Sequence, residues 1–122
     1  MLNELAQPRR IATEQRVTQL SPEEAALVHS LLGAWPLDEV LGLQRVTGGA
    51  TNRVYRVETA RGLAFLRVYK RAERALAERE HALIAHVRDR GLPAPPPRLA
   101  RSGSTVVEQA GNVCALYEPA AG

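Results

Sequence analysis

Residues 48–71 read GGATNRVYRVETARGLAFLRVYKR. Apolar and polar side chains alternate over residues 53–59 and again over residues 63–69, which indicates two strands with one face each toward a core. Ala60-Arg61-Gly62 predicts the turn between them, because glycine adopts positive φ without steric cost. The stretch therefore predicts a β-hairpin that follows directly after a pair of glycines.

A helix is expected before this hairpin. Ser21-Pro22-Glu23-Glu24 is typical of a helix N-terminus, in which Ser21 caps, Pro22 takes the first helical position and Glu24 completes a capping box. Gly33 and Pro36 end the helix. Apolar residues within it share one face, which makes the helix amphipathic: Leu27, Val28, Leu31, Leu32 and Trp35.

A second helix is expected after the hairpin, over residues 72–90. Its apolar residues share one face at about 100° per residue, and we expect that face to pack on the sheet. Gly91 and Pro93 end the helix. The apolar residues are Leu76, Leu83, Ile84 and Val87.

Further strands are predicted on both sides of these elements. Residues 41–46 form a strand that leads into the glycine pair, and short strand signals follow around 105–108 and 113–117. The order predicts an α+β fold: a five-stranded antiparallel sheet with a helix packed on it. Residues 1–20 show no sustained periodicity and are interpreted as a flexible arm, and residues 21–122 as one domain.

Composition limits the classes of partner. The chain has 122 residues, a formal net charge of +3 and 4% aromatic residues. The small basic excess fits an anionic ligand but is more typical of an ordinary charged surface. Few aromatics argue against base stacking on nucleic acid, and no apolar run approaches the ~20 residues that span a bilayer. We expect a cytoplasmic protein that binds neither nucleic acid nor membrane.

Glu80 and Arg67 are the charged residues that fit their predicted positions least well. Glu80 falls inside the apolar stripe of the second helix, and Arg67 lies mid-strand on the face of Phe65 and Tyr69. Buried charges need partners, so Arg67 and Glu80 are predicted to approach each other, with the guanidinium available to a phosphate. The alternatives are a partly exposed Glu80 at the helix edge and an Arg67 that reaches water from an edge strand.

The remaining candidates carry weaker signals. Glycines in Gly48-Gly49-Ala50-Thr51-Asn52 would let backbone N–H groups approach an anion, although Gly-Gly in a hairpin is often only a turn. The loop is not a Walker motif, since a strand follows it and no Gly-Lys-Ser/Thr does. Cys114 is interpreted as a small buried side chain. The three histidines, His29, His81 and His86, are interpreted as surface residues of helices, with no metal-ligand spacing.

The chain resembles the N-terminal lobe of the aminoglycoside phosphotransferase and choline kinase-like family, in particular the type II homoserine kinase-like members. The resemblance covers about residues 36–122 and rests on four segments in order: LQRVTGGATNRVYRVE, LAFLRVYKR, AEREHALIAHVRDRGLPAPPP and LYEPAAG. It implies a protein kinase-like lobe with an αC-type helix and an extra N-terminal helix. It also implies ATP as the nucleotide.

The resemblance assigns roles to individual residues. The loop Gly48, Gly49, Ala50, Thr51 and Asn52 would cover the nucleotide, and Val54 would lie over the adenine. Arg67 would contact the α- and β-phosphates, and Glu80 would pair with it. The backbone of Tyr117, Glu118 and Pro119 would bond to the adenine edge. Protein kinases differ in having three glycines in the loop and lysine at the position of Arg67.

The resemblance also implies what this stretch does not contain. No His-x-Asp or Asp-Phe-Gly-like motif occurs in the 122 residues, so the catalytic base and the Mg²⁺ ligands would belong to a C-terminal lobe. We therefore expect a nucleotide-binding lobe that is inactive alone, from an enzyme that phosphorylates a hydroxyl of homoserine, choline or an aminoglycoside. The alternative is a non-catalytic sheet-and-helix module that binds a partner, or itself through the face of Val54, Phe65 and Tyr117.

Overall fold

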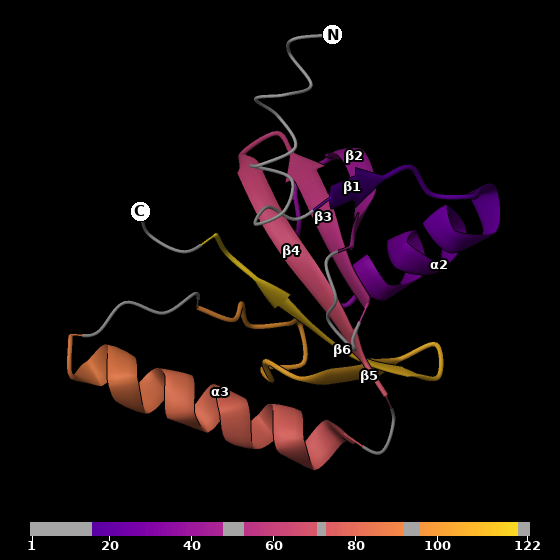
Figure 1. Ribbon diagram of the computed structural model, residues 1–122. Helices are drawn as coiled ribbons and strands as arrows, with labels where there is room; N and C mark the ends of the chain where they lie inside the picture. The colour runs from indigo at the N-terminus through magenta and orange to yellow at the C-terminus, as the bar shows by residue number, and fades with distance from the viewer. Residues whose placement is uncertain (1–15, 48–52, 71–72, 92–95, 120–122) are drawn as a thin grey trace, which may run out of the picture.

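The computed structural model describes residues 16–47, 53–70, 73–91 and 96–119. Its centre is a six-stranded antiparallel sheet in the order β1-β2-β3-β4-β6-β5 (Figure 1). The strands are β1 (Arg16–Thr18), β2 (Val40–Thr47), β3 (Arg53–Thr59), β4 (Gly62–Tyr69), β5 (Val107–Gln109) and β6 (Asn112–Tyr117).

The five predicted strands are confirmed, and β1 adds a sixth at the edge of the sheet. Residues 16–18 were expected to belong to the flexible arm, but they pair antiparallel with β2, from Arg16 opposite Thr47 to Thr18 opposite Arg45. A strand of three residues carries almost no periodic signal of its own. It forms here because β2 offers it the backbone groups of a free edge.

The predicted hairpin is formed by β3 and β4. Their register runs without interruption from Arg53 opposite Val68 to Thr59 opposite Gly62. Gly62 has φ of +132°, which explains the glycine at this turn. The Thr59 hydroxyl closes the turn by accepting a hydrogen bond from the Arg61 N–H and donating one to the Gly62 carbonyl.

Helix α2 (Pro22–Leu32) covers one face of the sheet. Its predicted apolar stripe is confirmed: Val28, Leu31, Leu32 and Trp35 are at most 4% exposed. They pack against residues of three central strands, namely Tyr55, Val57, Leu66, Cys114 and Leu116. This cluster is the main hydrophobic core, and Cys114 lies buried in it as predicted.

Only half of the predicted capping box is formed. The Glu24 N–H donates to the Ser21 hydroxyl at 3.2 Å, as an N-cap requires. The Glu24 carboxylate, however, accepts a 2.6 Å hydrogen bond from the Tyr55 hydroxyl and lies 3.5 Å from Arg45. The carboxylate therefore links α2 to β2 and β3. In a capping box it would instead accept a hydrogen bond from the backbone N–H of Ser21.

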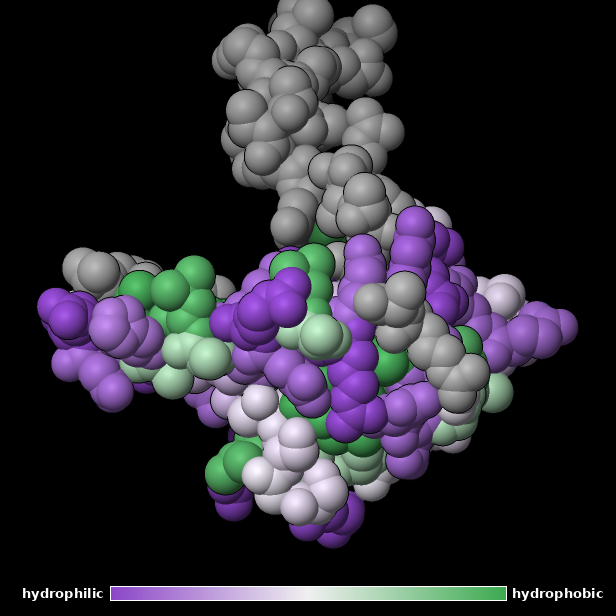
Figure 2. All heavy atoms as spheres, turned by 90° about the horizontal axis from the view of Figure 1, so that it is seen from below, coloured by the Kyte–Doolittle hydropathy of each residue, from purple (hydrophilic) through white to green (hydrophobic). Residues whose placement is uncertain are grey.

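Helix α3 (Arg74–Asp89) belongs to the opposite face of the sheet, and Figure 1 shows the two helices on different sides of the strands. The prediction that its apolar stripe packs on the sheet is wrong for Leu76 and Leu83, whereas Ile84 and Val87 are half-buried. Leu76 is 44% and Leu83 60% exposed, whereas Ala77 and His81 are buried. Where α3 lies, Figure 2 shows hydrophobic side chains at the surface among hydrophilic ones. The helix ends as expected, with Gly91 at φ of +82°.

Residues 96–104 precede β5 in the sequence and are held by hydrogen bonds of their backbone groups. The Arg98 N–H donates to the Leu116 carbonyl, and the Arg101 N–H donates to the Ala34 carbonyl. The Trp35 indole N–H donates to the Arg98 carbonyl at 3.1 Å. This segment thus links the end of α2 to β6. Within the described residues, no helix has the length and apolarity needed to cross a bilayer.

The two leucine environments give a direct test of this packing. Leu31→Ala in α2 is expected to lower the free energy of unfolding by about 2–5 kcal/mol, because a fully buried side chain leaves a cavity. Leu83→Ala in α3 is expected to change it by less than about 0.5 kcal/mol, as for other surface substitutions. Urea denaturation followed by circular dichroism measures both. Comparable losses in the two variants would contradict the orientation of α3.

Candidate functional site

The sheet face on the α3 side carries most of the predicted site residues that the structure describes. The register places Val54 opposite Arg67, and Arg67 opposite Ala115. Phe65 lies opposite Tyr117 in the next row. Because side chains at directly opposed positions share a face, these five residues form one surface across β3, β4 and β6, which we call the Arg67 face. Val54, Phe65, Arg67 and Tyr117 are half-buried.

Two tyrosine rings surround the guanidinium at the centre of the Arg67 face. The Arg67 Cζ lies 5.9 Å from the centroid of the Tyr69 ring and 5.7 Å from that of the Tyr117 ring. Both distances allow a cation–π attraction. The two hydroxyl oxygens are 2.6 Å apart and share a hydrogen bond. The rings are therefore fixed relative to each other and hold the cation between β4 and β6.

Glu80 forms no ion pair with Arg67 among the residues that the structure describes. Among the described residues, the ion pairs join Arg45 to Glu24, Arg61 to Asp38, and Arg74 to Glu78 and Glu108. Burial is the main cause that raises the pKa of Tyr117; the Glu80 carboxylate also raises it, and the Arg67 guanidinium opposes the shift. Both charges thus act on the same tyrosine. A salt bridge between Arg67 and Glu80 is not found in the described part of the chain, and an approach of the two groups to within one water of each other stays a prediction.

His81 is a central residue of this region that sequence reasoning missed. It was interpreted as a surface histidine, yet it is 7% exposed and both ring nitrogens have partners. Its Nδ1 lies 2.7 Å from the Thr105 hydroxyl and its Nε2 2.7 Å from the Tyr117 hydroxyl. Desolvation by burial lowers the pKa of His81, and the Arg67 charge lowers it further. The sequence held one signal for the burial of His81: Ala77, one turn earlier, has a small side chain that lets the helix approach the sheet.

The backbone at 117–119 is partly occupied by the segment before β5. The Glu118 N–H donates to the Pro96 carbonyl at 3.0 Å, and Pro97 bridges to Tyr117. Pro119 has no N–H to offer. The backbone of Glu118 and Pro119 can therefore offer carbonyl acceptors to a ligand. It has no N–H that is not already hydrogen-bonded. The predicted loop Gly48–Asn52 lies outside the described residues.

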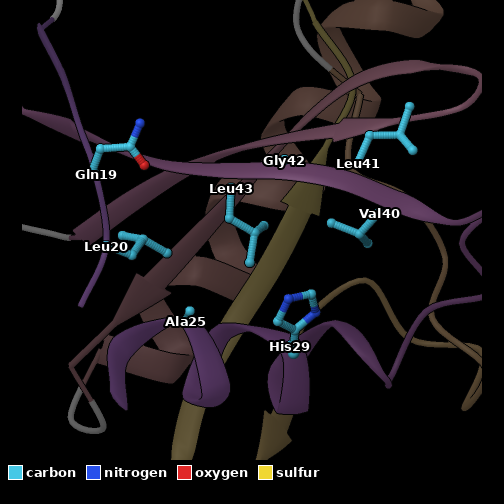
Figure 3. A pocket seen from close by; sticks show the side chains of 8 residues that line it. All are labelled: Gln19, Leu20, Ala25, His29, Val40, Leu41, Gly42 and Leu43. Carbon is cyan, nitrogen blue, oxygen red and sulfur yellow. The ribbon is translucent and has the colours of Figure 1, made fainter. Parts of the chain in front are cut away.

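A separate cavity of about 250 Å³ lies between α2 and the start of β2 (Figure 3). His29 points from the helix toward Val40 and Leu43 of the strand, while Leu41 points away. Leu43 packs against the core beneath α2, so this cavity is on the sheet face opposite Arg67 and is not part of the same site. In the described part of the chain, no group of three His, Cys, Asp or Glu side chains could hold a metal ion.

Comparison with known proteins gives one match. The model of a family described as "Phosphotransferase enzyme family" matches residues 42–122, about two thirds of the chain. The matched region begins within β2 and includes the whole Arg67 face, α3 and β6. No curated protein and no solved structure matches the chain.

The absence of an ion pair between Arg67 and Glu80 among the described residues predicts a weak energetic coupling. In a double-mutant cycle with Arg67→Met and Glu80→Gln, the coupling free energy is expected to stay below about 1 kcal/mol, as for partly exposed charges that are not in direct contact. Each variant and the double variant are unfolded in urea at low salt. A coupling of about 3–5 kcal/mol, typical of a broken buried pair, would contradict the geometry and restore the direct pair.

Proposed function

This chain belongs to the phosphotransferase enzyme family, and on that premise we propose that residues 21–122 form the nucleotide-binding lobe of an ATP-dependent small-molecule phosphotransferase. The enzyme would transfer the γ-phosphoryl group of ATP to a substrate hydroxyl, such as that of homoserine, choline or an aminoglycoside. The observation that carries the proposal is the half-buried Arg67 at the centre of a sheet face, with Val54 on one side and Tyr117 on the other.

Charge complementarity favours an anion at Arg67. In the described part of the chain, no carboxylate lies within ion-pair distance of its guanidinium, and aromatic rings alone leave a positive charge uncompensated. A guanidinium presents a planar fork of donors that matches phosphate oxygens. We assign Arg67 to the α- and β-phosphates. We assign α3 to the place of the αC-type helix and Glu80 to that of its acid.

The adenine would lie on the apolar part of the same face. Val54 supplies an apolar contact beside Arg67, in register with it on the neighbouring strand. A carbonyl of Glu118 or Pro119 would accept a hydrogen bond from the adenine amino group. The Glu118 N–H already donates to Pro96, so we do not assign it to the base. The resemblance implies that the backbone here bonds to the adenine edge. In Glu118 and Pro119 we restrict that role to a hydrogen bond that a carbonyl accepts.

The residues of this chain supply binding and orientation. The sequence contains two aspartates, Asp38 and Asp89, and neither stands in a His-x-Asp or Asp-Phe-Gly-like motif. Phosphoryl transfer also needs a carboxylate that positions the attacking hydroxyl, and Mg²⁺ to neutralise the phosphates. We assign neither role to a described residue. We therefore propose that these 122 residues bind nucleotide without turning it over.

Arg67→Met is expected to weaken ATP binding by roughly tenfold or more, since a hydrogen-bonded charge contributes about 1.5–3 kcal/mol. Adenosine, which has no phosphates, should bind the variant and the parent chain equally. Fluorescence titration with a labelled ATP, competed with ATP, AMP and adenosine, separates the two contributions. The matched control is Arg61→Met, which removes an exposed arginine of the hairpin turn.

Three outcomes would count against this proposal. Equal affinity of the Arg67→Met and parent chains for ATP would remove Arg67 from the phosphate site. An equal loss for adenosine would assign it to the base. ATP consumption by the 122 residues alone, in the presence of homoserine, choline or an aminoglycoside and above a heat-treated blank, would contradict the assignment of catalysis to other residues.

A further inference from the structure

We propose that His81 is a positioning residue for Arg67: through Tyr117 it sets where the guanidinium lies, and so couples helix α3 to the phosphate-binding position. The inference rests on the proposed function only in taking Arg67 as the cation that faces phosphate. The coupling itself is a property of this chain and can be measured without any nucleotide.

A continuous chain of hydrogen bonds joins α3 to the sheet. The Thr105 hydroxyl contacts His81 Nδ1 at 2.7 Å, and His81 Nε2 contacts the Tyr117 hydroxyl at 2.7 Å. The Tyr117 hydroxyl in turn lies 2.6 Å from that of Tyr69. The four residues come from the segment before β5, from α3, from β6 and from β4. This series of hydrogen bonds therefore links four segments of the domain.

The two tyrosines at the end of this series of hydrogen bonds support the Arg67 guanidinium. Tyr69 and Tyr117 are the two rings that lie beside the Arg67 guanidinium, and their shared hydrogen bond fixes their spacing. The His81 ring also meets the Tyr117 ring edge-on, with centroids 5.4 Å apart. A displacement of His81 must therefore move the Tyr117 ring or break its hydrogen bond. Either change alters the support beneath Arg67.

Few other buried contacts could carry the same coupling. Of the α3 side chains that the structure describes, Ala77 and His81 are the buried ones, and Ala77 has no polar group. Glu80 forms no ion pair with Arg67 among the described residues. His81 thus provides the buried polar link between the helix and the sheet, whereas the Arg74–Glu108 ion pair joins α3 to β5 at the surface.

The link works best with a neutral imidazole. A neutral ring has one donor and one acceptor, and an imidazolium has two donors. Because the hydroxyls of Thr105 and Tyr117 can each donate or accept, both forms of the ring can make every bond of the series, and they differ in their charge. Protonation would place a second positive charge beside Arg67. On α3 the charges of Glu78 and Glu80 favour that protonation; burial and Arg67 on β4 oppose it, and lower the pKa of His81. The other titratable groups facing it, Tyr69 and Tyr117, have raised pKa values through burial.

The test observes Arg67 directly. In a ¹⁵N-labelled chain the Arg67 Nε–Hε signal should be displaced by the two ring currents from the position of an exposed arginine such as Arg61. His81→Leu should move the signal toward that position, and His81→Gln, whose amide can still donate and accept, should restore part of the displacement. His86→Gln, an exposed histidine of the same helix, should leave it unchanged. Lowering the pH should reduce the displacement in the parent chain and not in His81→Gln.

Each result decides the proposal. An unchanged Arg67 signal in a folded His81→Leu variant would overturn it, as would an equal change in His86→Gln. If His81→Leu does not fold, Tyr117→Phe keeps the ring and removes both hydrogen bonds; an unchanged Arg67 signal there would also overturn it. If the signal follows His81 while Arg67→Met leaves ATP affinity unaltered, the coupling stands and the phosphate role fails.

Discussion

The guanidinium of Arg67 must be kept half-buried on the sheet face toward α3, and the rest of the site is arranged around this constraint. A charge at such a position is costly unless polar or polarisable groups meet it. In this chain the Tyr69 and Tyr117 rings meet it, and their hydroxyls bond to each other and to His81. No carboxylate of the described residues cancels the charge within ion-pair distance. The cation is thus held in place while its charge remains available to an anion.

The two faces of the sheet serve different purposes because their helices pack differently. On the α2 side, Val28, Leu31 and Trp35 close a hydrophobic core with buried residues of β3, β4 and β6, and Glu24 accepts a hydrogen bond from Tyr55. On the α3 side, the buried side chains of the helix are Ala77 and His81. Elements held by few buried contacts are those that move most easily in native proteins. A well-packed face and a lightly attached helix on opposite sides of the sheet would suit the nucleotide-binding role that we propose.

Local patterns were enough to predict much of the fold. Alternation gave the β3–β4 hairpin and placed Arg67 with Phe65 and Tyr69, and the Ser21 cap gave the start of α2. Other features depend on residues far apart in the sequence. The 3.6-residue period groups Leu76 with Leu83 but does not say whether that stripe faces the sheet or the solvent. His81 is buried because Tyr117, 36 residues later, meets its ring. The β1 strand forms because β2 has a free edge. The three residues of β1 are too few to show a strand pattern in the sequence.

The central claim is that a nucleotide binds on the Arg67 face, and mapping the binding surface tests it most directly. In ¹H–¹⁵N and methyl spectra of the chain titrated with ATP, the largest shifts should occur at Val54, Arg67 and Tyr117, with smaller shifts at His81 through the link to Tyr117. Residues of the core on the α2 side, such as Leu43 of β2 and Leu31 of α2 itself, should remain unchanged. Shifts concentrated around His29 and Leu43, or no saturable shifts on the Arg67 face, would contradict the account.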